Sequence, residues 1–404
     1  MNLSEFIENN WANTIREVKK DSGTLIGLPY PFTIPSINDY FQEMYYWDTY
    51  FTSVGLIAGG LVAQAKNNCN NLKYLADRYG FIPNASRTYY LTRSQPPYFA
   101  FAVKDLEKEY APYELKDFYF SVANEYEWWQ KNRSTDTGLN RYGDNGVSDR
   151  LYAESAEYAK QRIKVPKNAN ETELGKDHFA VCESGWDCSP RFGKVIGCKD
   201  SLPIDLNSNL YFYETYLASL QSLLGINDGI DWAERAEKRK KAIDCLMWNT
   251  EKEMYYDYNF VTKKQSEVIS CAAFHPYFVK MADKNKTRGL ENAYDALMKP
   301  YGLACTDRDY GHYQWSYPNG WAPLQYIAYI ALKNYDMTDK AESVAEKYVK
   351  LLEKVYENTG TTFEKYNVAD GNDRTLDENS DHHTMMGWTT GVYVYFKKEL
   401  EKND

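Results

Sequence analysis

The stretch DLNSNLYFYETYLASLQSLLG, residues 205–225, carries the clearest helical signal in this 404-residue chain. Asp205 is a residue type that favours an N-cap, and Gly225 stands where a helix would end. Between them, apolar side chains recur every three or four residues: Leu206, Leu210, Tyr213, Leu217, Leu220 and Leu224. This spacing predicts an amphipathic helix that starts at Asp205 and ends at Gly225.

Comparable apolar stripes lie on both sides of this helix. They run through Tyr50, Val54, Ile57 and Leu61, then Leu115, Phe118, Val122 and Trp129, and after Asp231 through Ala236, Ile243 and Met247. Two more helices are expected over residues 322–334 and 341–357, whereas strand signals such as 254–258 are few and short. Because no linker or low-complexity segment interrupts the series, we predict an all-α chain of helical hairpins that forms one domain, residues 1–404.

The hairpin pattern has a consequence for the loops. Trp321 precedes the helix over 322–334, and Glu364 follows the helix that returns from it. A short connection between antiparallel helices brings the two outer loops back to the same end. Loops that are far apart in sequence can therefore meet at one rim of a ring of helices and share a pocket.

Composition excludes several classes of partner. A net charge of −10 argues against nucleic acid and against an anionic membrane surface. No run of 18 apolar residues is present, and the first 21 residues, MNLSEFIENNWANTIREVKKD, contain no apolar signal core. We therefore expect a cytoplasmic protein with a small-molecule partner, and the sequence gives no indication of its oligomeric state.

The metal-binding residue types are sparse. The chain has seven cysteines without a CxxC pair and only five histidines. This pattern is not that of a disulfide framework or a zinc site, so we expect no bound metal. His382 and His383 are adjacent but lack a third ligand at a suitable spacing.

The segment VCESGWDCSPRF, residues 181–192, concentrates the candidate chemistry around Asp187. A carboxylate that follows a glycine and a tryptophan suits a sugar site, because sugars offer hydroxyl groups and an apolar ring face. The small Gly185 would let a ligand come close. The alternative is a solvated aspartate in a turn.

Other loops supply a family resemblance. The segments are DYFQEMYYWDTYF (39–51), IPNASRTYYLTRSQPP (82–97), ESGWDCSPRF (183–192), QWSYPNGWAPLQ (314–325), FEKYNV (363–368) and GWTTGV (387–392). Together and in this order, they resemble the trehalases of glycoside hydrolase family 37, over roughly residues 29–396. The resemblance implies an (α/α)6 toroid, which agrees with the hairpins inferred from the apolar stripes.

The resemblance also implies two catalytic carboxyl groups and no cofactor. Asp187 matches the general acid and Glu364 the general base of an inverting hydrolase. Inversion needs the two carboxyl groups about 6.5–9.5 Å apart, with room for a water molecule. Burial beside Trp186 would favour the protonated acid. The alternative for Glu364 is a surface turn with its side chain in water.

The substrate-binding residues implied by the resemblance are aromatic, polar and acidic. They are Phe41, Trp47, Asp48, Asn84, Arg93, Gln95, Glu154, Gly185, Trp315 and Glu378, with Trp321 in the second tryptophan motif. For the aromatic members, core packing inside a helical ring is the alternative. Arg93 is a stronger candidate, because a guanidinium in an aromatic loop is costly unless it is paired or faces a ligand.

The sequence departs from the family pattern around the sugar. Tyr40 and Tyr152 stand where the family has arginines, and Ser316 stands where it has an aspartate. The glycine-rich lid is replaced by residues 371–387, GNDRTLDENSDHHTMMG. We predict inverting hydrolysis of an α-linked glucose disaccharide, with α,α-trehalose as the first candidate. Another small α-glycoside and a non-hydrolytic sugar-binding role remain as alternatives, although a binding module has no need for both carboxylates.

Overall fold

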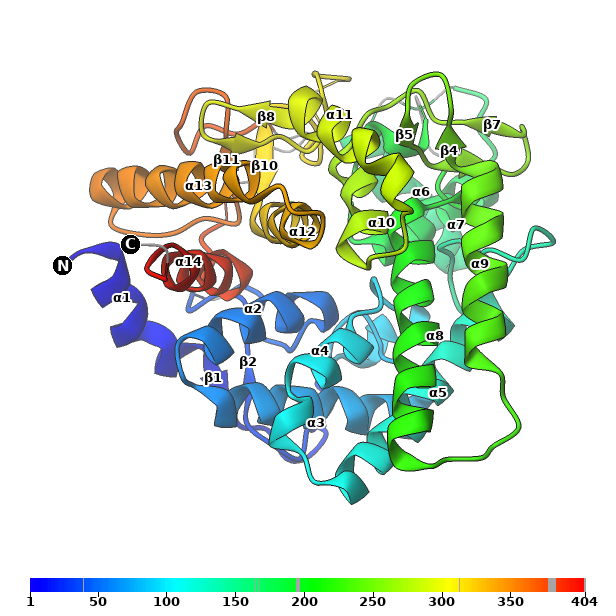
Figure 1. Ribbon diagram of the computed structural model, residues 1–404, viewed down its shortest axis with the longest axis horizontal. Helices are drawn as coiled ribbons and strands as arrows, with labels where there is room; N and C mark the ends of the chain where they lie inside the picture. The colour runs from blue at the N-terminus through cyan, green and yellow to red at the C-terminus, as the bar shows by residue number, and fades with distance from the viewer. Residues whose placement is uncertain are drawn as a thin grey trace.

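The computed structural model describes residues 1–38, 40–163, 165, 167–193, 197–311, 313–376 and 383–402. Helices joined by loops dominate this part of the chain (Figure 1). The α-helices are α1 (Leu3–Asn10), α2 (Tyr46–Ala58), α3 (Val62–Tyr79), α4 (Phe99–Asp105), α5 (Pro112–Arg133), α6 (Asp149–Arg162), α7 (Glu171–Ser184), α8 (Ile204–Leu224), α9 (Trp232–Leu246), α10 (His275–Phe278), α11 (Thr287–Leu297), α12 (Ala322–Asn334), α13 (Thr338–Thr359) and α14 (Gly387–Leu400).

The strands are two or three residues long and form small antiparallel ribbons. They are β1 (Ile15–Arg16), β2 (Phe32–Thr33), β3 (Ser201–Leu202), β4 (Trp248–Asn249), β5 (Met254–Tyr255), β6 (Tyr258–Asn259), β7 (Lys264–Gln265), β8 (Met298–Lys299), β9 (Gly302–Leu303), β10 (Asn319–Trp321) and β11 (Lys365–Asn367). The pair β10–β11 joins the loops before α12 and after α13, and it places Trp321 opposite Lys365. This ribbon confirms that the outer loops of one hairpin return to the same end.

The helix over 205–225 ends as predicted but begins differently. Gly225 adopts the left-handed conformation, with φ +61°, directly after α8. The helix begins at Ile204, after Pro203, so Asp205 lies in the first turn and is not the N-cap. Its carboxylate instead accepts a hydrogen bond from Arg191, at 2.8 Å. The role of Asp205 is therefore set by a buried ion pair with Arg191, which cannot be inferred from the spacing of apolar residues.

Consecutive helices form hairpins that are arranged in a ring. The pairs α2 and α3, α8 and α9, and α12 and α13 pack against each other. The ring closes where the C-terminal α14 lies against α2, as the red and blue helices of Figure 1 show. The helices α2, α4, α8, α10, α12 and α14 all contribute to a central cavity of about 740 Å³. They therefore form the inner ring. Among the described residues, no helix combines the length and apolar character that crossing a bilayer requires.

Two glycines, Gly55 and Gly391, allow the backbones of α2 and α14 to approach each other closely. A Cβ atom added at Gly55 would lie 2.3 Å from the Cα of Gly391, and one added at Gly391 would lie 2.4 Å from the Phe51 carbonyl oxygen. Both neighbours are backbone atoms, so a side chain cannot be accommodated by a change of rotamer. The ring closes at this point because both residues lack side chains.

We therefore expect Gly391→Ala to lower the free energy of unfolding by about 1–3 kcal/mol, the usual cost of overpacking a core. Urea unfolding followed by circular dichroism measures the change. Gly143→Ala is the matched control, because its added Cβ would come no closer than 3.4 Å to the Arg133 side chain. Equal stability of the two variants would contradict the proposed close packing.

Candidate active site

A cavity of about 150 Å³ lies at the N-terminal ends of α2, α12 and α14, where the motif-bearing loops converge. The residues around it come from segments far apart in sequence: Phe41, Tyr45, Trp47, Asp48, Asn84, Tyr90, Arg93, Gln95, Cys182, Gly185, Asp187, Gln314, Trp315, Trp321, Glu364, Met385 and Trp388. The predicted Asp187 and Glu364 thus share one cavity with eight of the predicted substrate-binding residues. The hairpin argument correctly predicted that these loops would meet.

Asp187 follows the C-terminus of α7 in a tight turn. Gly185 has φ +69° there, and a Cβ atom at this position would lie 2.8 Å from the indole of Trp47. The turn is held by Ser184 Oγ, which accepts a hydrogen bond from the Trp186 backbone N–H at 3.1 Å. Glycine is required here both by the backbone conformation and by the approach of the Trp47 ring.

The Asp187 side chain is partly buried, and its Oδ1 atom is fully shielded from solvent. Its Oδ1 atom has no hydrogen-bond partner among the residues that the structure describes. Burial raises the pKa of Asp187, and this effect exceeds the opposite influence of the positive charges of Arg162 and Arg93. A buried, unpaired carboxyl oxygen is costly unless a ligand or proton satisfies it. The surroundings of Asp187 therefore suit a group that donates a proton, and the solvated-turn alternative is wrong.

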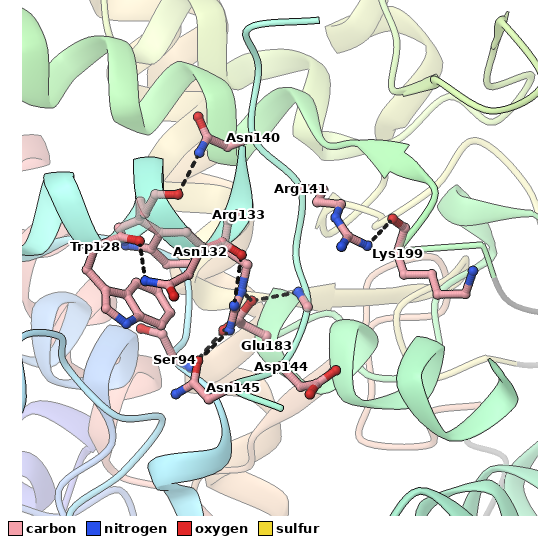
Figure 2. A network of polar contacts seen from close by, with 12 residues as sticks. Ser94, Trp128, Asn132, Arg133, Asn140, Arg141, Asp144, Asn145, Glu183 and Lys199 are labelled. Carbon is pink, nitrogen blue, oxygen red and sulfur yellow. Dashed lines mark hydrogen bonds and ion pairs between the residues drawn. The ribbon is translucent and has the colours of Figure 1, made fainter. Parts of the chain in front are cut away.

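The end of α7, just before the turn that carries Asp187, is anchored by a buried ion pair, which Figure 2 shows from close by. Arg133 donates to both carboxylate oxygens of Glu183, at 2.7 and 2.8 Å. The same carboxylate accepts hydrogen bonds from the backbone N–H groups of Ser94, at 2.9 Å, and Gly143, at 2.7 Å. Glu183 thereby ties the end of α7 to the loop that carries Arg93.

Glu364 lies directly before β11 on the other side of the cavity. Its side chain is only 14% exposed, and Oε2 lies 3.6 Å from Lys365 Nζ. The Glu364 backbone N–H donates to the His383 carbonyl at 3.0 Å, and its carbonyl accepts a hydrogen bond from the Trp388 indole at 3.3 Å. These contacts fix the backbone next to the carboxylate, so the surface-turn alternative for Glu364 is wrong.

Asp48 is a third carboxyl group in the cavity. Burial, together with the negative charges of Glu364 and Asp187, raises the pKa of Asp48 well above its ordinary value. Two of the cavity's carboxyl groups therefore have raised pKa values. A raised pKa alone does not identify the acid, and the distinguishing feature of Asp187 is its unpaired Oδ1 atom.

Four tryptophans form one wall. The ring centroids of Trp47 and Trp315 are 5.6 Å apart, and Trp315 and Trp321 stack at 3.9 Å with an interplanar angle of 4°. Trp388 meets Trp47 edge-on at 5.6 Å. These side chains are buried, yet they line the cavity. The four tryptophans therefore pack in the core and also form part of the cavity wall.

Three polar residues from the segment 82–97 line the cavity. Gln95 Oε1 accepts a hydrogen bond from the Trp47 backbone N–H at 3.1 Å, and Asn84 Nδ2 donates to the Ser94 carbonyl at 3.2 Å. The guanidinium of Arg93 lies over the Tyr90 ring at 5.0 Å. Its Nε atom is buried and has no hydrogen-bond partner within the described chain. Arg93 is therefore placed to donate to a ligand.

Two predicted residues do not join this group. Glu378 falls outside the described residues. Glu154 is described, but it is on the outer side of α6, where its side chain is 54% exposed and pairs with Arg150 at 2.8 Å. The buried stripe of α6 runs through Tyr152, Ala156 and Ala159, and a residue two positions after Tyr152 points to the opposite side of a helix. The structure therefore does not bring Glu154 to the cavity.

The positions that depart from the family also lie outside the cavity lining. Tyr40 is exposed and contacts the His383 ring, with centroids 5.1 Å apart. The Tyr152 hydroxyl donates to Asp144 at 2.8 Å, and Ser316 forms a buried hydrogen bond with Thr306 at 3.0 Å. Neither tyrosine is among the described residues that line the cavity.

Sequence reasoning missed several residues. Tyr45, Tyr90, Cys182, Gln314, Met385 and Trp388 line the cavity without having been predicted as site residues. Trp388 stood in the GWTTGV segment, so a signal existed for it. Arg162, whose charge acts on Asp187, stands 25 positions earlier at the end of α6. No motif links the two, and only the packing of α6 against α7 relates them.

The larger cavity of about 740 Å³ lies toward the C-terminal ends of the inner helices. Its walls are mainly aromatic and aliphatic, and Lys104, Lys280, Lys398 and Lys402 surround it. Its two acidic residues are Asp105 and Glu399, and Glu399 pairs with Lys402 at 2.5 Å. The smaller cavity differs from it in combining the Asp187 and Glu364 carboxyl groups, a tryptophan wall and a buried Asp187 oxygen without a hydrogen-bond partner in the described structure.

Solved structures share this fold. The chain is similar to neutral trehalase Nth1 from Saccharomyces cerevisiae, with a TM-score of 0.74 and 27% identity over 91% of this chain and 73% of that chain. It is also similar in fold to the mannosylglycerate hydrolase of glycoside hydrolase family 63 from Thermus thermophilus, with a TM-score of 0.64 and 16% identity over 91% of this chain and 96% of the other. The predicted all-α (α/α)6 toroid is confirmed.

Sequence relatives correct the predicted location. The chain is 32% identical to proteins named periplasmic trehalase from Xanthomonas axonopodis pv. citri, over 420 residues, and from Salmonella enteritidis PT4, over 421 residues. Each match covers 96% of this chain and 72% of the relative. These names contradict the prediction of a cytoplasmic protein, which was wrong. That prediction rested on the lack of an apolar signal core in the first 21 residues. The polarity of these residues gives information about this segment alone and does not determine where the protein is located.

The match to a family model extends over almost the whole chain. The model described as trehalase matches residues 2–401. This range contains the loops that surround the cavity and both carboxyl groups inferred to be catalytic. The similarity of sequence, fold and motif order points to the same conclusion: the chain belongs to the trehalase family of glycoside hydrolases.

Proposed function

We propose that this chain hydrolyses α,α-trehalose to two glucose molecules with inversion at the attacked carbon. Asp187 is the general acid, Glu364 is the general base, and residues 1–404 act as a single catalytic domain. The observation that carries the assignment is the buried Asp187 Oδ1 atom, which lacks a hydrogen-bond partner in the described structure and shares a cavity with Glu364. The assignment rests on this geometry together with the family membership.

The reaction requires one proton transfer at each carboxyl group. Asp187 gives its proton to the glycosidic oxygen as the bond to the anomeric carbon breaks. Glu364 takes a proton from a water molecule, whose oxygen attacks that carbon from the opposite face. The two carboxyl groups and the water complete the hydrolysis, so the mechanism needs no metal and no organic cofactor.

Binding of the sugar is assigned to the cavity wall. The tryptophans offer apolar faces to the ring, and Asp48, Arg93 and other polar lining residues meet its hydroxyl groups. A cavity of about 150 Å³ is the size that accommodates one six-membered ring. The enclosed space therefore suits one glucose, and the second glucose extends toward the mouth. Phe41 also lines the cavity and packs edge-on against His383, with ring centroids 5.4 Å apart.

A second candidate keeps the mechanism and changes the substrate to another small α-glycoside. It is favoured by Tyr40 and Tyr152, which replace expected arginines and do not line the cavity. Each missing arginine would remove a charged hydrogen bond to a sugar hydroxyl, which costs about 1.5–3 kcal/mol of binding free energy. The residues around the sugar hydroxyls therefore differ from the family pattern.

A substrate panel distinguishes these candidates. Purified protein is incubated with trehalose and other α-linked disaccharides, and released glucose is measured. We expect the highest kcat/KM for trehalose. Turnover of a different α-glycoside without turnover of trehalose would establish the second candidate, and no turnover on the whole panel would favour a non-hydrolytic sugar-binding role.

We expect Arg162→Gln to move the alkaline limb of the pH–rate profile to higher pH. The acid must be protonated to act, so activity is lost as pH rises through the pKa of Asp187. Arg162 is the strongest influence that lowers this pKa, and its removal lets the pKa rise further. The measurement is kcat/KM against pH.

Arg150→Gln is the matched control for Arg162→Gln. Arg150 is on the same helix, but it is exposed and pairs with Glu154 at 2.8 Å. Its profile should coincide with that of the wild-type protein. An unchanged or acid-shifted limb in Arg162→Gln would remove Arg162 from the environment of the acid.

A further inference from the structure

Trp186, Trp315 and Trp321 form a row of packed rings, called here the stack, in which the first pair is tilted by 37° and the second pair is parallel within 4°. Trp315 and Trp321 also line the cavity. The centroids of Trp186 and Trp315 are 5.1 Å apart, and those of Trp315 and Trp321 are 3.9 Å apart. Each end of the stack carries a buried cation. The Arg191 guanidinium lies 4.4 Å from the Trp186 centroid, and Lys365 Nζ lies 5.3 Å from the Trp321 centroid. The result is a continuous series of five buried side chains.

Both ends of the stack adjoin a carboxyl group of the proposed mechanism. Trp186 immediately precedes Asp187 in the chain. Lys365 immediately follows Glu364, and its Nζ atom lies 3.6 Å from Glu364 Oε2. The contact between Lys365 and Trp321 is built into the β10–β11 ribbon, in which these two residues are directly opposite each other. The stack is therefore a direct physical link between the acid loop and the base strand.

The end near the acid is fixed to the ring of helices. Arg191 binds Asp257 through two hydrogen bonds, at 2.9 and 2.8 Å, and Asp205 at 2.8 Å. Asp205 belongs to the first turn of α8. A planar guanidinium held in this way has little freedom, and it presents its face to the Trp186 indole. At the opposite end, the Trp321 indole N–H donates to the Gln314 carbonyl at 3.1 Å.

We propose that this stack sets the separation of Asp187 and Glu364, with Trp186, Arg191 and Lys365 as positioning residues. Inversion requires the carboxyl groups about 6.5–9.5 Å apart. The two ring-to-ring steps, 5.1 and 3.9 Å, leave little free space between the rings that connect the acid loop to the base strand. Close-packed aromatic rings are hard to compress and transmit a displacement from one ring to the next. Trp186 and Lys365 do not line the cavity in the described structure, so they act through their neighbours.

The inference rests on the proposed function, and a pair of substrates separates positioning from general damage. Trehalose requires protonation of its leaving group, whereas α-glucosyl fluoride does not, because fluoride departs as an anion without help from an acid. Both substrates require the base to activate water. A displaced acid therefore affects only trehalose, and a displaced base affects both.

The first variant is Trp186→Phe, which shortens the stack beside the acid. We expect kcat for trehalose to fall by about 10–100-fold, the size of effect that a displacement near 1 Å produces. Turnover of α-glucosyl fluoride should stay within about threefold of wild type, because the base is not displaced. Lys365→Met is expected to lower turnover of both substrates.

Trp232→Phe is the matched control, since Trp232 is also fully buried but lies in α9, outside the stack. Its turnover of both substrates should match wild type. If Trp186→Phe does not fold, Arg191→Lys provides the test. It keeps the charge beside Asp205 and Asp257 and removes the planar group over Trp186, and the same selective loss on trehalose is expected.

Equal loss on both substrates in Trp186→Phe, or no loss on either, would overturn the positioning role. So would unchanged turnover of the fluoride by Lys365→Met. Wild-type protein that turned over neither substrate would reject the proposed function itself, and with it the stack's role. A failure of the positioning role alone would appear as an active wild type with non-selective variants.

Discussion

Asp187→Asn is expected to lower turnover of trehalose by about 10²–10⁴-fold, the usual contribution of a positioned acid. Asparagine keeps the shape of the side chain but carries no transferable proton. The Oδ1 atom of Asp187 is buried, and the raised pKa of this carboxyl favours the protonated form that the reaction needs. Glu364→Gln should cause a loss of the same order, because an amide cannot take a proton from water.

The two carboxyl variants have matched controls on the surface of the same chain. Asp117→Asn and Glu357→Gln make the same chemical changes at exposed helical positions. Their kcat and KM for trehalose should equal those of wild type. A wild-type rate in Asp187→Asn or Glu364→Gln would remove that residue from the mechanism.

Glu183→Gln is expected to lower the free energy of unfolding by about 3–5 kcal/mol, because it leaves a buried arginine without its counter-charge. Glu183 and Arg133 are both buried, and two backbone N–H groups also bind this carboxylate (Figure 2). The affected residue lies four positions before Asp187. Urea unfolding at neutral pH measures the change, and activity in the absence of urea should fall as well.

Glu173→Gln is the control within the same helix, α7. Glu173 pairs with Lys176 at 3.0 Å, but its side chain is 51% exposed, and such surface pairs contribute about 0–1 kcal/mol. The double variant Arg133→Met, Glu183→Met should recover part of the lost stability, since it leaves no unpaired buried charge. Similar stability of Glu183→Gln and Glu173→Gln would contradict the anchoring role.

The sequence was most informative where local pattern and geometry coincide. Apolar spacing predicted α8, α9 and α12, because a helix that covers a core must present one apolar face. Motif order predicted that Asp187 and Glu364 would share a cavity with Trp47 and Trp315. These residues lie in or beside the loops that flank the helices, and the hairpin topology determines which of these loops meet.

Features that depend on tertiary contacts were not predictable in the same way. Asp205 has the residue type of an N-cap, but it binds Arg191, and nothing in the apolar stripe records that partner. Glu154 matched a family position, yet the rotation of α6 turns it toward solvent. Arg162 acts on Asp187 through the packing of two helices, a relation that no spacing within the sequence expresses.

The central claim is that Asp187 and Glu364 act on opposite faces of the sugar, and the stereochemistry of the first products tests it most directly. Proton NMR of trehalose hydrolysis by the wild-type protein should show one α-glucose and one β-glucose per cleaved bond before mutarotation equalises them. The β anomer arises at the carbon attacked by water, and the α anomer is the released leaving group. Initial formation of α-glucose alone would show retention and contradict the assignment of Glu364 as a general base.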